Sequence, residues 1–162
     1  MRRTLPLEKV GIAMMGLLWS LLGLLSGTFI ALQAPINAAL ARDLGVPVAA
    51  AAASFLAGSV VLVAISLAVG QAQGVSLAWR APPLWMFVAG GLLGAVYVTS
   101  VIVLTPKLGT AATMAFIVAG QMLAGLVLDH MGLFGFLERA ITPGRMAGAV
   151  LLVLGALLIR VY

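Results

Sequence analysis

The chain has 162 residues, of which 64% are apolar and only 8% charged, and its formal net charge is +5. Soluble domains contain about 45–50% apolar and about 25% charged residues, so this composition excludes a water-soluble globular protein and favours a membrane protein. In such a protein the positive charge belongs to the loops, and no basic patch interleaved with aromatic residues indicates a nucleic acid partner. Because cysteine is absent, disulfides and thiolate metal sites are excluded.

Long stretches without a charged residue indicate transmembrane helices. Residues 10–41, 44–79, 81–106 and 108–128 carry no charge, and each stretch reaches the roughly 20 residues that cross a bilayer. In lipid, backbone amides find partners only within helices or closed barrels, and continuously apolar runs exclude a barrel. We therefore predict an all-α integral membrane protein with one domain over residues 1–162. Its five spans are expected at about 11–41, 47–69, 84–104, 110–128 and 143–160.

The first predicted span, residues 11–41, is longer than one perpendicular crossing. It must therefore tilt, kink at Pro35 or project beyond the membrane. Residues 37–41 also carry small side chains of the kind that a signal peptidase accepts. The apolar run before them, however, is far longer than the roughly 7–15 residues of a signal peptide core, which favours a retained span.

Turn-forming residues separate the remaining spans. Gly45 and Pro47 are placed to end the first helix and to begin the second. Residues 70–83 and 129–142 are expected to form the two long loops. The short sequence at 105–109 predicts a tight turn, which makes the third and fourth spans antiparallel neighbours.

Basic residues favour one orientation in the membrane. The N-terminal side of the predicted spans carries Arg2, Arg3, Lys9, Arg80, Arg139 and Arg145, whereas the other side carries Arg42, Lys107 and Arg160. This bias favours a cytoplasmic N-terminus. Because the bias is modest, insertion in both orientations stays open.

Small residues recur at four-residue spacing along several spans. The pairs are Gly23/Gly27, Ser54/Gly58, Gly90/Gly94 and Gly144/Gly148. Small residues let helix backbones approach closely in lipid, so we expect these pairs to form packing faces.

The carboxamides of the first span are candidate functional groups, because polar side chains inside hydrocarbon are costly. Gln33 and Asn37 lie one helical turn apart on either side of Pro35. A helix broken between two carboxamides can bind a polar solute, as interrupted helices do in transporters. The alternative is interhelical hydrogen bonding that only holds the bundle together, worth about 0.6–2 kcal/mol per contact. The sequence leaves both open.

Two further spans carry polar side chains. Tyr97 and Ser100 lie one turn apart on the third span; the tyrosine can line a cavity, whereas serine often bonds the preceding turn of its own helix. Gln121 lies near the middle of the fourth span. We predict that these residues bind substrate with Gln33 and Asn37, with interhelical bonding as the alternative for each.

Asp129 and His130 are the only neighbouring acid and imidazole in the chain. They are weak candidates for proton coupling, since histidine titrates near neutral pH. The alternative is that both mark the water boundary at the end of a helix. With one histidine and four scattered acids, the sequence offers no metal site, no nucleophile–base set and no cofactor motif, so we do not expect an enzyme.

Taken in order, the motifs resemble the YdcZ-like family of the drug/metabolite transporter superfamily. In the first half these are residues 27–40 (GTFIALQAPINAAL), Gly45-x-Pro47 and Ala53-Ser54-Phe55-x-x-Gly58. In the second half they are Gly91-x-x-Gly94-Ala-x-Tyr97-Val-Thr-Ser100, Pro106-x-Leu-Gly109, Gly120-Gln121, Asp129-His-x-Gly132, Pro143-Gly144-Arg145 and Gly148. Together they cover nearly the whole chain.

The resemblance implies half of a ten-helix inverted-repeat transporter in a bacterial cytoplasmic (inner) membrane. An odd helix number inverts a second copy joined in sequence. A lone five-helix unit is therefore expected to form a homodimer, or a heterodimer with a paired relative, in parallel or antiparallel arrangement. The implied function is secondary transport or export of small polar or amphipathic solutes by alternating access. The alternatives are a non-transporting assembly or accessory subunit and, third, a channel, although the chain lacks a filter motif.

Overall fold

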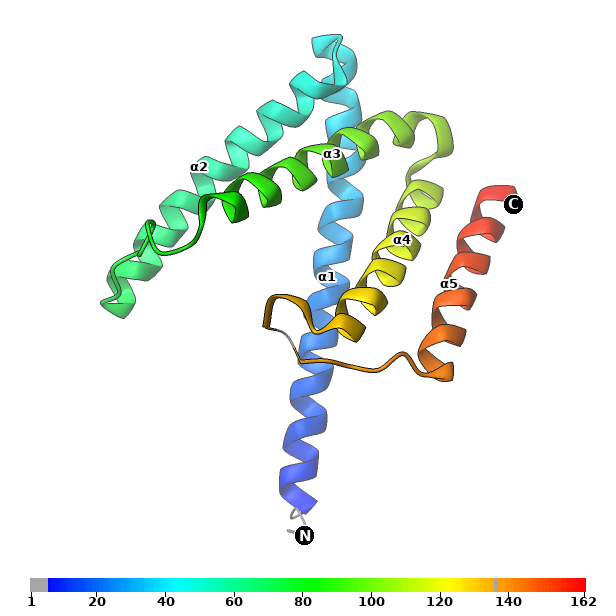
Figure 1. Ribbon diagram of the computed structural model, residues 1–162. Helices are drawn as coiled ribbons and strands as arrows, with labels where there is room; N and C mark the ends of the chain where they lie inside the picture. The colour runs from blue at the N-terminus through cyan, green and yellow to red at the C-terminus, as the bar shows by residue number, and fades with distance from the viewer. Residues whose placement is uncertain (1–5, 136) are drawn as a thin grey trace. The chain divides into compact units, whose positions relative to one another are not determined.

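The computed structural model describes residues 6–135 and 137–162 and confirms the predicted all-α membrane fold (Figure 1). The helices are α1 (Pro6–Leu44), α2 (Pro47–Gln73), α3 (Leu84–Leu108), α4 (Thr110–Met131) and α5 (Pro143–Val161), with the short 3-10 helix η1 (Leu133–Gly135) between α4 and α5. Over the described residues five helices are long and apolar enough to cross a membrane, and no strand occurs.

Two prolines lie inside helices. Helix α1 continues through Pro35 without a break, so the interrupted helix considered for this position does not form. Helix α3 includes Pro106, which the sequence placed in the turn, and the connection to α4 is reduced to Gly109. A proline removes only one backbone donor from a helix, and both proline rings lie on exposed faces. Gly109 makes the reversal with φ of 81°, a conformation that glycine adopts most easily.

The described chain divides into two compact units within α1. The first unit ends at Gln33 and contains the N-terminal part of α1, whose described side chains are almost all exposed. The second unit begins at Ala34 and contains the end of α1 together with α2, α3, α4 and α5. The core described below belongs to this second unit.

The core of the second unit is small and rich in alanine. Ala41, Ala50, Ala51, Val98 and Ile102 form one buried cluster, against which Leu40 and Tyr97 pack. These residues come from the end of α1, the start of α2 and the second half of α3, so the cluster lies where these segments meet. Alanine allows the close backbone approach on which helix packing in lipid depends.

Helices α4 and α5 pack against each other, and each carries buried residues at heptad spacing. On α4 these residues are Ala112, Ala119 and Leu126, and on α5 they are Ala149 and Ala156. Residues seven apart return to nearly the same face of a helix, so each series forms a continuous seam. We call these residues the α4–α5 seam.

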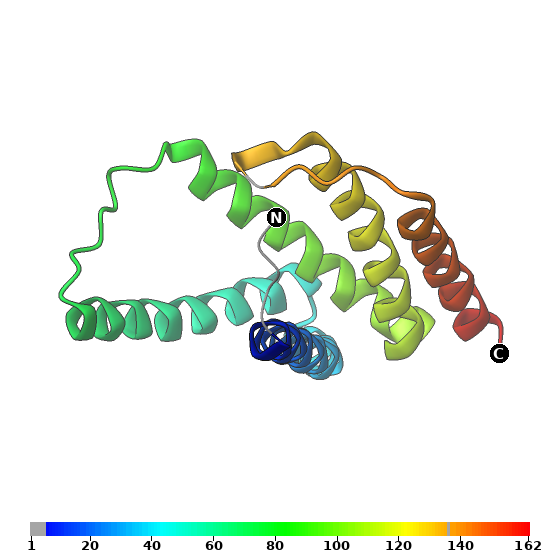
Figure 2. The same cartoon turned by 90° about the horizontal axis from the view of Figure 1, so that it is seen from below.

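Helices α2 and α3 are packed over a shorter length. Their buried residues lie at the alanine-rich end, apart from Gly70 beside the loop that follows α2. From there the two helices diverge toward the connection at residues 74–83 (Figure 2). One further contact lies outside the cluster, where the Phe55 ring covers Gly94.

The predicted glycine packing faces are mostly unused within the chain. A Cβ atom added at Gly23, Gly27, Gly58, Gly90, Gly144 or Gly148 would meet no atom within 4 Å. Only Gly94 is in close contact, because a Cβ there would lie 3.0 Å from Cζ of Phe55. The other glycines therefore lie on faces open to lipid or to another molecule.

Candidate functional site

Asn37 is the most buried of the predicted site residues. It lies on a face of α1 that also buries Ala34, Ala38 and Ala41, and it is only 5% exposed. No hydrogen bond to its side chain occurs within the described part of the chain. The Asn37 amide is not among the fully enclosed polar groups without a partner, so it stays partly open to the surroundings of the helix, where an amide can donate and accept hydrogen bonds.

Tyr97 borders the alanine-rich core from α3. Its side chain is half-buried and packs against the alanine-rich cluster that contains Ala41. Asn37 precedes Ala41 by one turn on the buried face of α1, but it is not a member of this cluster.

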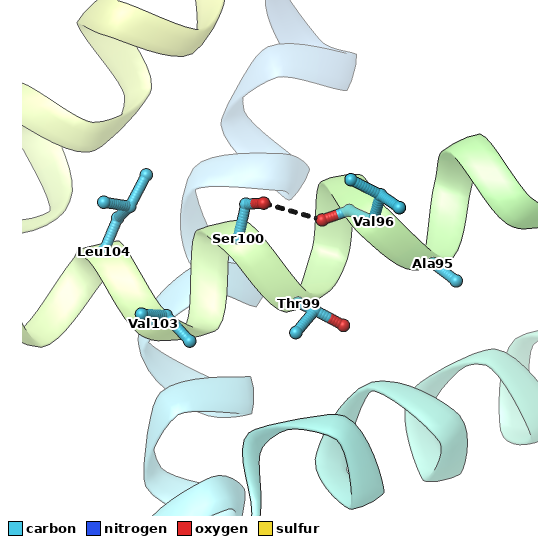
Figure 3. Close-up of a pocket in the computed structure, with 6 residues that line it drawn as sticks. All are labelled: Ala95, Val96, Thr99, Ser100, Val103 and Leu104. Atoms are coloured by element: carbon cyan, nitrogen blue, oxygen red, sulfur yellow. Dashed lines mark hydrogen bonds between the residues drawn. The ribbon is translucent and has the colours of Figure 1, made fainter.

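Ser100 lines a hollow along α3 with a volume of about 500 Å³, together with Ala95, Val96, Thr99, Val103 and Leu104 (Figure 3). The Ser100 hydroxyl donates to the Val96 carbonyl oxygen at 2.8 Å. This is the bond within its own helix that the sequence left open as an alternative, and it occupies the serine proton. Thr99 lines the same hollow, and its hydroxyl, unlike that of Ser100, makes no hydrogen bond within its own helix.

Gln33 and Gln121 are both exposed. Gln33 is the last residue of the first unit, whereas Gln121 lies in α4 of the second unit. The Gln121 side chain makes no hydrogen bond within the described residues. A carboxamide on the outside of a membrane helix is costly unless it meets a polar partner, so Gln121 stays a candidate for binding.

Asp129 and His130 lie in the last turn of helix α4, and their surroundings differ. The Asp129 carboxylate forms an ion pair with the Arg145 guanidinium, and the side chains of Arg145 and Asp129 are 30% and 41% exposed. His130 is exposed. Proton coupling by these two residues stays a prediction, and the ion pair adds a second role for Asp129.

Thr113 is a buried polar residue that the sequence did not single out. It is fully buried on α4, and its hydroxyl has no partner among the described residues. The backbone N–H of Thr113 donates to the Gly109 carbonyl oxygen at 3.1 Å. Threonine in a membrane helix often bonds to its own helix, so the sequence alone gives no sign that the Thr113 hydroxyl lacks a partner.

The described residues contain no group of three histidine, cysteine, aspartate or glutamate side chains that could hold a metal ion. What the geometry offers is hydrogen bonding: a buried amide, a half-buried phenol and two hydroxyls, on apolar helices. Such groups can bind and release a solute.

Comparison with known proteins gives a family match over residues 18–158, to the family described as "Putative inner membrane exporter, YdcZ". The chain is also 40% identical over 75 residues to the inner membrane protein YdcZ of Escherichia coli (strain K12), a match that covers 46% of this chain. That match spans half of the length of the curated relative. No solved structure matches the chain.

Proposed function

Because the chain belongs to the YdcZ family of inner membrane exporters, we propose that it exports small polar or amphipathic solutes by alternating access, as a dimer of five-helix units. The family match and the five apolar helices make it an integral inner membrane protein of a transporter family, not of an enzyme family. The proposal goes further in naming the class of solute, the mechanism and the dimer.

One observation carries the proposal: the Asn37 carboxamide is buried among alanines yet bonds nothing in the described chain. If Asn37 only held the helices together, its amide would bond a neighbouring helix. An amide that bonds no neighbouring helix is better suited to a solute. Gln33, Ser100 and Gln121 are the further members of the proposed binding set, and proton coupling through Asp129 and His130 is its weakest part.

Open faces support the dimer. The Gly90 and Gly148 backbones and the Gln121 side chain are exposed on the single chain. A second copy, or a paired relative, would bury the glycines by close backbone approach and give the carboxamide a partner. Crosslinking in native membranes, with Gly148→Leu as the disrupting variant and Gly11→Leu, at an exposed helical glycine of α1 outside these faces, as the control, measures the dimer directly.

The transport test uses Asn37→Leu in proteoliposomes. A panel of amino acids, short-chain amines and quaternary ammonium dyes is first screened for a shift in the melting temperature of the purified protein. Flux of the stabilising solute is then expected to fall about three- to tenfold in Asn37→Leu, the loss of one hydrogen bond. Ser66→Ala is the matched control, because Ser66 lies on α2 outside the proposed binding set and its hydroxyl already bonds the Leu62 carbonyl of its own helix.

The same variant separates transport from the assembly alternative. For a transporter, Asn37→Leu leaves the melting temperature of the unliganded protein unchanged or raised, since a buried unpaired amide is removed. For an assembly subunit whose polar residues only bind other helices, Asn37→Leu lowers the melting temperature or the dimer yield, and no solute in the panel moves along a gradient. The second pattern would refute the proposal.

A further inference from the structure

The connection between α4 and α5 is held by one arginine that binds three segments. The Arg145 Nη2 donates to Oδ2 of Asp129 at the end of α4. Its Nη1 donates to the carbonyl oxygens of Arg139 at 3.1 Å and Ala140 at 3.3 Å, in the loop between the helices. Arg145 itself lies in the first turn of α5. We call this set of bonds the Arg145 clasp.

Backbone bonds on both sides complete the clasp. The N–H of Arg139 donates to the main-chain carbonyl of Asp129 at 2.8 Å. At the start of α5, the Thr142 hydroxyl accepts the Arg145 N–H at 3.3 Å and caps the helix. Asp129 therefore binds the loop with its backbone and Arg145 with its side chain.

Arginine suits this position because its planar group donates in several fixed directions. A lysine could pair with Asp129 as a point charge, but its single nitrogen would not hold the Arg139 and Ala140 carbonyls together with the carboxylate in the same geometry. Arg145 and Asp129 are both partly exposed, and an isolated ion pair there contributes little. The two carbonyl bonds distinguish the clasp from such a pair.

The clasp continues the α4–α5 seam to the end of the helices. Leu126 is the last buried seam residue on α4, and Asp129 follows it by one turn. Thus α4 and α5 pack against each other and are fastened at their connected ends. Helices α2 and α3 are different, because their axes diverge toward their own connection (Figure 2) and their side chains there, such as Leu67 and Val88, are exposed.

We propose that Arg145 is a positioning residue whose clasp makes α4 and α5 one rigid body, against which α2 and α3 spread and close. This inference rests on the proposed function, and it adds which helices move during transport and which stay fixed. The clasp itself can be measured without any solute, so its failure and the failure of transport are separable.

Distances between spin labels test the rigid body, and the chain helps because it contains no cysteine. Leu128→Cys with Met146→Cys reports on α4 and α5, and Leu67→Cys with Val88→Cys on α2 and α3; all four positions are exposed. Labelled protein is diluted with unlabelled protein in liposomes, which removes distances between copies. We expect a narrow α4–α5 distribution and a broader α2–α3 distribution. An α2–α3 distance distribution as narrow as that of α4–α5 would overturn the proposal that α2 and α3 move against a rigid α4–α5 pair.

Variants of the clasp test its cause. Arg145→Gln and Asp129→Asn are expected to broaden the α4–α5 distribution, and to speed hydrogen exchange in residues 132–142 about three- to tenfold. Arg145→Lys keeps the charge, so it should retain the α4–α5 distance while exchange in the loop still accelerates. Arg145→Lys therefore still tests the clasp if Arg145→Gln folds poorly, because it is expected to change the loop exchange and not the distance.

Two arginines of the chain are matched controls. Arg139 contributes only its backbone to the clasp, and Arg160 lies at the other end of α5. Arg139→Gln and Arg160→Gln should therefore leave exchange and distances unchanged. If Arg139→Gln acted like Arg145→Gln, or if Arg145→Gln changed neither measurement, the clasp would not be the device that joins the helices.

Discussion

Replacing Gly94 by alanine is expected to destabilise the α2–α3 contact, whereas the same change at Gly90 is not. A Cβ at Gly94 would lie 3.0 Å from Cζ and 3.4 Å from Cε1 of Phe55. Carbon atoms in good contact are about 3.5–4.0 Å apart, so the ring must withdraw. A Cβ at Gly90, one turn earlier on α3, meets nothing within 4 Å.

The magnitude follows from two opposing terms. Overpacking costs about 1–3 kcal/mol, and the lower end applies because Phe55 is 39% exposed and can move outward. Alanine gains about 0.8–1 kcal/mol over glycine in a helix, and this gain is the same at both positions. Gly94→Ala should thus be less stable than Gly90→Ala by about 1 kcal/mol.

Unfolding of the two variants in mixed detergent micelles of increasing denaturing fraction measures this difference. Adding Phe55→Leu to Gly94→Ala should remove most of it, because the shorter side chain leaves room for the methyl group. Equal stability of Gly90→Ala and Gly94→Ala, or a double variant that shows no such recovery, would refute the reasoning from the Phe55 contact.

Two further predictions concern α4 and its entry. Thr113→Val should raise the free energy of unfolding by about 0.5–1.5 kcal/mol, because it removes a fully buried hydroxyl without a partner and keeps the volume; unfolding in mixed micelles measures this, and a loss of stability would mean that the hydroxyl is bonded. Gly109→Ala should lower the melting temperature, since φ of 81° with ψ of 157° is a conformation that costs a non-glycine residue about 1–3 kcal/mol, and an unchanged melting temperature would show that the turn adapts.

The predicted site residues differ in their surroundings. The sequence singles out Asn37 and Tyr97, because a carboxamide and a phenol are conspicuous on apolar helices, and their part in binding stays a prediction. The sequence could not separate Ser100, which bonds its own helix, from Thr113, which bonds nothing in the described chain. Both are hydroxyls on apolar helices, and only the packing around each decides whether a partner is reached.

The helix ends show the same limit. The sequence leaves a kink at Pro35 open and places Pro106 in a turn, yet both prolines lie within helices. A proline removes one donor, and in lipid the rest of the helix keeps its bonds because no water replaces them. The glycine pairs were read as packing faces, but apart from Gly94 they face no other part of the chain.

The sequence by itself determined the all-α membrane fold and its five spans, because the cost of an unpaired backbone amide in hydrocarbon leaves a long apolar run little choice except a helix. It could not determine which faces of those helices meet, since lipid is as apolar as the side chains and gives no periodic signal of burial. Tertiary structure alone showed that Asn37 is buried without a partner, that Phe55 covers Gly94 and that Asp129 binds Arg145. Each of these depends on side chains brought together from separate turns or separate helices, a matter of shape that composition does not record.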